Sequence, residues 1–237
     1  MAVATFEVRH RGLLERRFYV LMVALTALVV VTGFSRTVNA GLIHPHFIVP
    51  PILYVHTALY VSWIAFLFVQ TGLVQTRRVA LHRTLGMGSL AFGAAMSVVG
   101  VLTALAMARV DRQLGSMVAT HLILTPFFDM LYFTVLFWLG IWYRKRPEFH
   151  RRFMLLATIV LTSAAFSRFP HFLVPQGWYY CAVDAMILLC VARDLVVQAR
   201  VHRVYLTVFP ILIAGQIITM TTSYAHWWDA LSEKIFQ

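Results

Sequence analysis

Long apolar stretches, separated by short connections, fill most of this 237-residue chain. A run of about 20 apolar residues is long enough for a helix to cross the hydrocarbon core of a membrane. The sequence contains seven such runs, at approximately 18–34, 49–74, 85–107, 117–142, 150–169, 177–197 and 204–223. Its 60% of hydrophobic and 12% of charged residues are typical of membrane proteins. We therefore expect an all-α, polytopic membrane helical bundle in which residues 1–237 form a single integral membrane domain.

The positions of the basic residues predict how this bundle is oriented. Fifteen of the 20 Lys and Arg residues fall at one end of the expected spans, and only Arg36, Arg109, Arg112, Arg168 and Lys234 fall at the other. By the positive-inside rule, the N-terminus is expected in the cytoplasm and the C-terminus outside. The same distribution accounts for the net charge of +11 without nucleic acid as a partner. Anionic lipid at the cytoplasmic face is the expected partner instead.

The start of the chain allows a second interpretation. Arg16 and Arg17 precede the first apolar run, and residues 38–40 resemble the cleavage site of a signal peptide. The run is longer than a usual signal core, so an uncleaved first span is preferred. Cys181 and Cys190 lie nine positions apart in the sixth run, which predicts neither a disulfide nor a metal motif.

A basic junction that contains a histidine occurs twice, at residues 77–83 and 145–151. Superposing His82 on His150 aligns helix, turn and helix in both copies, which predicts a repeated hairpin at 49–107 and 117–169. The two histidines then begin equivalent helices at one membrane face.

Two of the spans carry further structural signals. The third has small residues on one helical face and is expected to pack centrally; these are Gly86, Ser89, Gly93, Ser97 and Gly100. The apolar part of the fifth, 153–166, would be only about 21 Å long as a helix, against a hydrocarbon core of about 30 Å. That helix is therefore expected to extend from His150 to Arg168, unless the membrane thins.

Polar residues recur at helical spacing in two runs: His56, Tyr60, Trp63 and Gln70 in the second, and His121, Thr125, Asp129 and Tyr132 in the fourth. Polar residues within spans tend to face the bundle interior. Asp129 follows Pro126, which predicts a kink beside an acid that is protonated, hydrogen-bonded or paired. Asp184 is expected to pair with Arg168 near the outer face.

The histidines support a more specific hypothesis, because four consecutive spans each carry one. Helix direction puts His56 with His121 toward the outside and His82 with His150 toward the cytoplasm. Neutral imidazole is a good iron ligand, so two axial pairs would hold two stacked haems. In this arrangement the chain resembles the two-haem transmembrane cytochromes b, and the resemblance implies haem b as cofactor. For each histidine, an interfacial or internally bonded imidazole is the alternative.

Over nearly its whole length the chain also resembles a group of uncharacterised bacterial polytopic inner-membrane proteins. The residues that carry this resemblance are His56, Gln70, His82-Arg83-x-x-Gly86, Asp129, Arg146-Pro147-Glu148-x-His150, Leu155-Leu156-Ala157-Thr158, Arg168 and Asp184. The resemblance implies a multi-pass protein of the bacterial inner membrane and supports the choice of site residues. It implies no activity.

Three functions are consistent with these features. The most specific is haem-b binding for transmembrane electron transfer, and the second is a proton-coupled small-molecule carrier or binder that uses Asp129. The third is a non-catalytic subunit or assembly factor of a membrane complex, with membrane proteins as partners. No phosphate loop, nucleophile triad or zinc motif is visible, so no metal site is expected and an enzymatic activity is left open.

Overall fold

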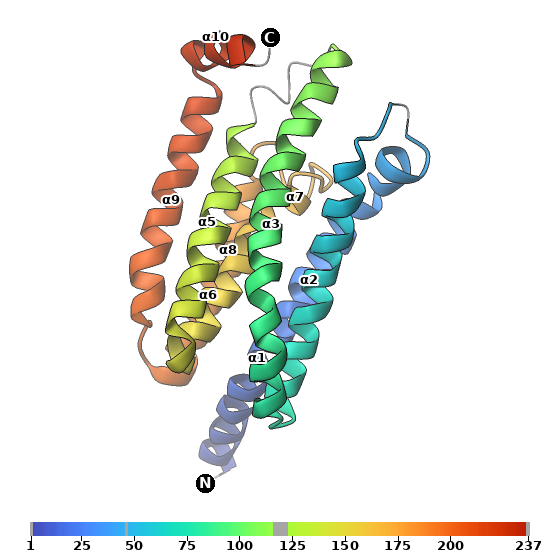
Figure 1. The fold of residues 1–237 in the computed structure, drawn as a ribbon. Helices are drawn as coiled ribbons and strands as arrows, with labels where there is room; N and C mark the ends of the chain where they lie inside the picture. Colours follow the sequence, from blue (N-terminus) through green and yellow to red (C-terminus); the bar gives the residue numbers. More distant parts are fainter. Residues whose placement is uncertain (1, 46, 116–122, 236–237) are drawn as a thin grey trace.

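The computed structural model describes residues 2–45, 47–115 and 123–235, and these form a bundle of helices without any strand (Figure 1). The α-helices are α1 (Ala2–Ser35), α2 (Pro51–Gln75), α3 (Val79–Gln113), α5 (Leu124–Trp142), α6 (Pro147–Val160), α7 (Ser163–Phe166), α8 (Tyr179–Gln198), α9 (Arg203–Ser223) and α10 (His226–Ile235). A π-helical turn (Asn39–Ile43) follows α1, and a 3-10 turn (Tyr143–Lys145) follows α5. The prediction of an all-α fold is confirmed.

Five helical segments in the described ranges are long and apolar enough to cross a membrane: Arg17–Ser35, Pro51–Gln75, Val79–Gln113, Leu124–Lys145 and Arg203–Ser223. They correspond to the first, second, third, fourth and seventh expected spans. The fifth and sixth expected spans contain α6, α7 and α8, which do not meet that description. Residues 117–122, at the start of the fourth expected span, lie outside the described residues, and His121 is one of them.

Local sequence explains where several helices begin and end. Pro51 and Pro147 stand in the first turns of α2 and α6, where their missing amide hydrogens cost no helical hydrogen bond. The turn from α2 to α3 passes through Arg77 in the left-handed region (φ 61°). Ala199 takes the same region (φ 53°) where α8 ends and donates its amide to the carbonyl of Leu195.

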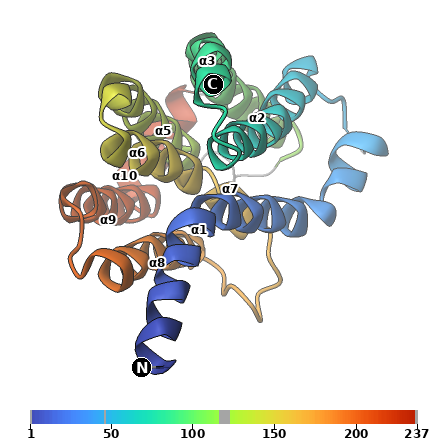
Figure 2. The ribbon, with the colours of Figure 1, turned by 90° about the horizontal axis from the view of Figure 1, so that it is seen from below.

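The most deeply buried helix is α6, and not α3 as the pattern of small residues predicted. Helix α6 packs against α1, α5, α8 and α9, whereas α3 packs chiefly against α2 and α5 at the edge of the bundle (Figure 2). The small face of α3 does allow close approach, because Gly93 lies against the ring of Phe137 and Gly100 lies against Tyr60 and Met130. The glycines therefore serve two helix pairs, α3 with α5 and α3 with α2, rather than a central position.

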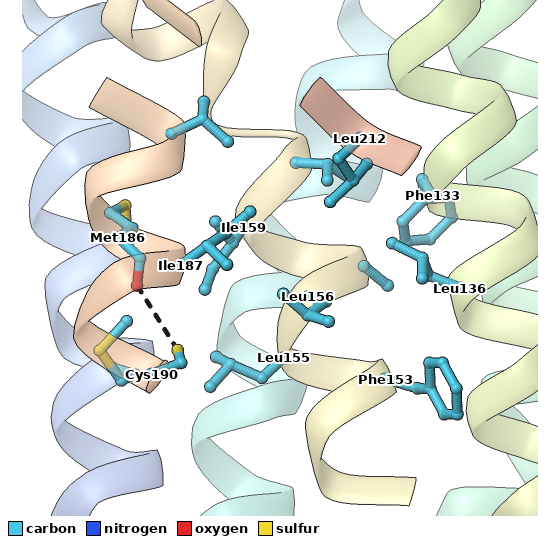
Figure 3. Close-up of a cluster of buried hydrophobic side chains, with 14 of the residues drawn as sticks. Phe133, Leu136, Phe153, Leu155, Leu156, Ile159, Met186, Ile187, Cys190 and Leu212 are labelled. Carbon is cyan, nitrogen blue, oxygen red and sulfur yellow. Dashed lines mark hydrogen bonds between the residues drawn. The ribbon is translucent and has the colours of Figure 1, made fainter. Parts of the chain in front are cut away.

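The hydrophobic core surrounds α6 (Figure 3). Its members include Phe133 and Leu136 of α5, Phe153, Leu155, Leu156 and Ile159 of α6, Met186, Ile187 and Cys190 of α8, and Leu212 of α9. Cys190 is buried and its thiol donates to the carbonyl of Met186 at 3.5 Å, while Cys181 is exposed and free. The two cysteines are not joined, as expected.

Candidate functional site: a buried acid at a broken helix

The expectation of one helix from His150 to Arg168 is wrong. Helix α6 ends at Val160, and the chain becomes helical again only in the short α7, which begins at Ser163. At the break the Thr162 hydroxyl donates to the carbonyl of Ile159 at 2.6 Å, and the Thr162 amide donates to the same carbonyl at 2.9 Å. Side-chain hydroxyls that bond nearby carbonyls compete with regular helical hydrogen bonds. The break therefore has a local cause, and it turns Ser163 toward α5.

Asp129 of α5 faces this break and is only 6% exposed. The hydroxyl of Ser163 donates to its Oδ2, and Tyr180 of α8 donates to its Oδ1 at 3.3 Å. No described residue forms an ion pair with Asp129. Helices α5, α7 and α8 thus converge on a carboxyl group that has two hydroxyl donors and no cation.

Pro126, which precedes Asp129, does not kink α5 as predicted. The helix begins at Leu124, so Pro126 stands in its first turn, where an amide has no partner within the helix. The helix interruption beside Asp129 lies between α6 and α7 instead.

A cavity of about 10 Å³ adjoins Asp129, lined also by Tyr132, Val160, Tyr180, Val183, Leu212 and Gln216. That volume is about the minimum that holds one water molecule. On its α9 side, Tyr132 donates to the carbonyl of Ile211 at 3.1 Å, and Gln216 donates to Asp184 Oδ1 at 2.9 Å. Polar groups from α5, α8 and α9 therefore form one layer through the bundle around the acid.

Three other predicted site residues have partners that the sequence did not indicate. Thr125 bonds the hydroxyl of Tyr179 at 3.1 Å. Asp184 pairs with Gln216 and not with Arg168, so that predicted pair is wrong. The guanidinium of Arg168 turns back to the carbonyl of Ala164 and lies 4.6 Å from the ring centroid of Phe34. Its contacts are therefore with α7 and α1 and not with Asp184.

The polar stripe of α2 faces its neighbours in the bundle. Tyr60 donates to the carbonyl of Met96 at 3.0 Å, and the almost fully buried Trp63 donates to Thr158 Oγ1 at 3.3 Å. His56 stacks on Tyr60 with ring centroids 4.0 Å apart, and its buried Nδ1 has no partner among the described residues. Its expected counterpart, His121, lies outside the described residues. The predicted pairing of His56 with His121 is therefore not tested by the structure.

The structure brings His82 of α3 and His150 of α6 together, with ring centroids 6.3 Å apart. The Nδ1 of His150 bonds the carbonyl of Gly140 at 2.8 Å, which leaves Nε2 directed elsewhere. Gln70 of α2 lies beside His82 and Gly86 in the first turns of α3. With its amide nitrogen toward α3, it donates to His82 Nδ1 at 2.5 Å and accepts from the amide of Gly86 at 3.2 Å.

A charged cluster at the same end of the bundle was missed from the sequence. Arg152 of α6 and Asp194 of α8 are completely buried and form a bidentate pair, with Nε to Oδ2 at 3.0 Å and an Nη to Oδ1 at 2.7 Å. Glu148 accepts from Arg152 at 2.7 Å and also from Arg151. Arg193 donates to Asp194 at 2.8 Å. One sequence signal was present, since Asp194 is an acid inside an apolar run and so required a cation.

The residues that bind Asp129 had a weaker signal. Ser163 and Tyr180 are ordinary members of their apolar runs and are separated from Asp129 by 34 and 51 positions. Only the packing of α7 and α8 against α5 brings them to the acid.

In comparisons with known proteins, no family model, curated protein or solved structure matches the chain.

Proposed function

We propose that the protein is a proton-coupled small-molecule carrier of the bacterial inner membrane in which Asp129 binds and releases the proton. One observation carries the proposal: a buried acid, bonded by Ser163 and Tyr180 and unpaired with any described cation, lies at the break between α6 and α7. Ionisable groups inside spans mark ion and substrate pathways more often than structural sites.

The surroundings of Asp129 favour a neutral carboxyl in the arrangement seen here. An ionised carboxylate without a cation costs several kcal/mol in an apolar interior, and two hydroxyl donors offset only part of that cost. A neutral acid gives up its proton when its surroundings become wetter or a cation approaches. Interrupted helices near the bilayer midplane form the ion sites of many carriers, and the break at Leu161 and Thr162 has this character.

The proposal includes seven membrane crossings with the N-terminus in the cytoplasm. In addition to the five apolar helices, α6 with α7 would form one crossing and α8 another, because α6 and α8 are joined at the end opposite Arg152 and Asp194 (Figure 1). Helix α6 is enclosed by its neighbours, and α8 buries one face that carries Arg193 and Asp194 while Leu188, Leu189 and Leu195 on its other face are exposed.

Infrared spectroscopy of the protein in lipid tests the protonation of Asp129. The wild type should show the carbonyl band of a protonated carboxyl at neutral pH, and Asp129→Asn should lose it. Ser163→Ala keeps the acid but removes one donor, so it should shift the band without abolishing it. A wild-type spectrum that is identical to that of Asp129→Asn contradicts the proposal.

Proton movement is tested in vesicles that contain the purified protein and a pH-sensitive dye. A coupled carrier moves protons only with its cargo, so the vesicles are supplied with a mixture of small metabolites. An imposed membrane potential should then drive proton uptake in the wild type, and Asp129→Asn should reduce its rate at least tenfold. Asp111→Asn is the matched control, because Asp111 is an acid of α3 that does not line the cavity beside Asp129. Equal rates for wild type and Asp129→Asn would count against a carrier.

The second candidate, haem-b binding for electron transfer, is favoured by the pair His82 and His150. Two imidazoles that bind one iron from opposite sides, each about 2 Å from it, have ring centroids about 6 Å apart, close to the 6.3 Å found here. The bond from His150 Nδ1 to a carbonyl is the usual way to leave Nε2 for a metal. His82 offers Nε2 only when the oxygen of Gln70 faces its Nδ1.

A haem at this place would supply one-electron redox chemistry when bound, and it requires Gln70 to turn its oxygen toward His82 Nδ1, opposite to the orientation that satisfies both atoms of its amide. The chain would hold the iron by His82 and His150 and fix both rings through Gly140 and Gln70. Haem added to the purified protein should give the sharp, shifted Soret band of haem bound by two histidines, which free haem lacks. His82→Ala and His150→Ala should each abolish that shift, while His171→Ala, at an exposed position, should retain it. A wild type that gains no Soret band excludes this candidate.

A further inference from the structure

Three side chains at the Arg152 end of the bundle have hydrogen-bond donors without partners. Arg193 is only 4% exposed, and its Nε and one of its Nη atoms bond nothing among the described residues. The same is true of the hydroxyl of Tyr19 on α1 and of Nε of Arg151 on α6. Buried donors are rarely left unpaired, because each costs about 1–3 kcal/mol and more when it is charged.

These donors surround one aromatic ring. The guanidinium carbon of Arg151 lies 5.1 Å from the ring centroid of Tyr19, and that of Arg193 lies 5.8 Å from it. Arg193 is also 5.8 Å from the ring of Phe18. Cation–π contacts position the two guanidinium groups without using their N–H donors. Helices α1, α6 and α8 therefore present donors around Tyr19.

The two carboxylates of the cluster already accept hydrogen bonds from its arginines. Both oxygens of Asp194 accept from Arg152, and its Oδ1 also accepts from Arg193. Glu148 accepts from Arg151 and Arg152. Among the side chains that the structure describes, three arginines thus face two carboxylates, which leaves an excess of one positive charge beside unpaired donors.

We infer that Arg193, Arg151 and Tyr19 bind one singly charged phosphate ester. A guanidinium group binds phosphate oxygens through two parallel N–H groups, and a tyrosine hydroxyl adds a third donor. A phosphodiester carries one negative charge and would balance the cluster. Tyr19 lies close to the start of the apolar part of α1, at the end of the bundle where basic residues are concentrated, so the phosphate of a membrane lipid is the nearest source.

The inference is independent of Asp129 and is tested by thermal unfolding of the full chain in a neutral detergent. Phosphatidylglycerol should raise the unfolding temperature of the wild type in a saturable manner. Arg193→Gln should weaken apparent binding about 10- to 100-fold, which corresponds to the loss of one or two charge-assisted hydrogen bonds. Arg200→Gln removes an exposed charge at the same end and should bind like the wild type.

Two further arms keep the test decisive. Tyr19→Phe removes a single hydroxyl and should weaken binding a few-fold to tenfold, even if Arg193→Gln fails to fold. Inorganic phosphate is added in place of lipid: a weaker effect than that of phosphatidylglycerol supports a lipid source, and an equal effect supports the same site with free phosphate as its ligand. Wild-type lipid binding in both Arg193→Gln and Tyr19→Phe, or no stabilisation by either ligand, would overturn the inference.

Discussion

His202 shows how one side chain can make the stability of this bundle depend on pH. Its Nδ1 accepts from the amide of Val204 at 3.2 Å and so caps the start of α9, while its ring packs against Phe149 with centroids 4.7 Å apart. Burial lowers the pKa of His202 below its usual value, and the positive charge of Arg152 lowers it further. Protonation at Nδ1 removes the lone pair that caps the helix.

We therefore predict that the protein loses stability as the pH falls below about 6.5, the usual pKa of histidine. The folded pKa is lower than the unfolded one, so the unfolded chain binds more protons in this range and stability rises with pH. The unfolding temperature in detergent should be lower at pH 5.5 than at pH 7.5. His202→Asn keeps a capping side chain and should flatten this dependence; an unchanged slope would exclude His202 as its source.

The pair of Arg152 and Asp194 is predicted to be the most sensitive ionic contact in the described chain. Asp194→Asn removes the only carboxylate that Arg193 bonds among the described residues and leaves Arg152 with Glu148 alone, and removing one member of a buried pair costs about 3–5 kcal/mol. Glu148→Gln is the control, since Glu148 is half-exposed and exposed pairs contribute about 0–1 kcal/mol. Denaturant unfolding of both variants measures the difference, and equal losses would argue against this ranking.

At the level of helices, the sequence predicted the helical segments but not the interruption of the fifth expected span between α6 and α7. Apolar runs predicted α2, α8 and α9 to within about two residues at each end, because each run ends at polar or turn-forming residues. No proline or glycine separates Val160 from Ser163. The break depends on hydroxyl groups that bond backbone carbonyls and on the acid that Ser163 meets in another helix, and a linear pattern contains neither.

The candidate site was predictable to the same limited extent. Helix direction alone brought His82 and His150 to one end, because both begin helices that run the same way. The pairing of Arg168 with Asp184 required side-chain directions, and the structure gives each a closer partner: Ala164 for the arginine and Gln216 for the acid. Depth in the membrane is therefore a poor guide to which polar groups pair.

Packing between α5 and α9 predicts a contrast between two glycines. A methyl group on Gly215 would collide with the hydroxyl of Tyr132, whereas one on Gly72 of α2 would meet no atom within 4 Å. Gly215→Ala should therefore destabilise the protein by about 1–3 kcal/mol, and Gly72→Ala should be neutral or stabilise α2 by up to about 1 kcal/mol. Unfolding temperatures of the two variants test this, and equal shifts would contradict the packing of Tyr132 against α9.

At the scale of the molecule, the bundle exposes many large apolar side chains and buries several charged ones beside its hydrophobic core. Only 11% of the apolar window of α2 is buried, and large apolar side chains such as Val61, Ile211 and Ile217 are exposed on α2 and α9. The buried faces of α6 and α8 carry Arg152, Asp194 and Arg193. This distribution fits lipid around the outer helices and polar contacts between the inner ones.

The number of membrane crossings depends on whether α6 with α7 and α8 each cross, and labelling of cysteines can count those crossings. If α6 with α7 and α8 both cross, the connection at 167–178 lies outside and Arg200 lies in the cytoplasm. In a background with the exposed Cys181 replaced by alanine, Phe172→Cys should react with an impermeant maleimide in intact cells, because Phe172 is 85% exposed. Arg200→Cys should react only after permeabilisation. Protection of both positions in intact cells and of Phe172→Cys after permeabilisation would mean that the connection is buried in the membrane, so that α6 and α8 enter and leave from one side and the chain crosses five times.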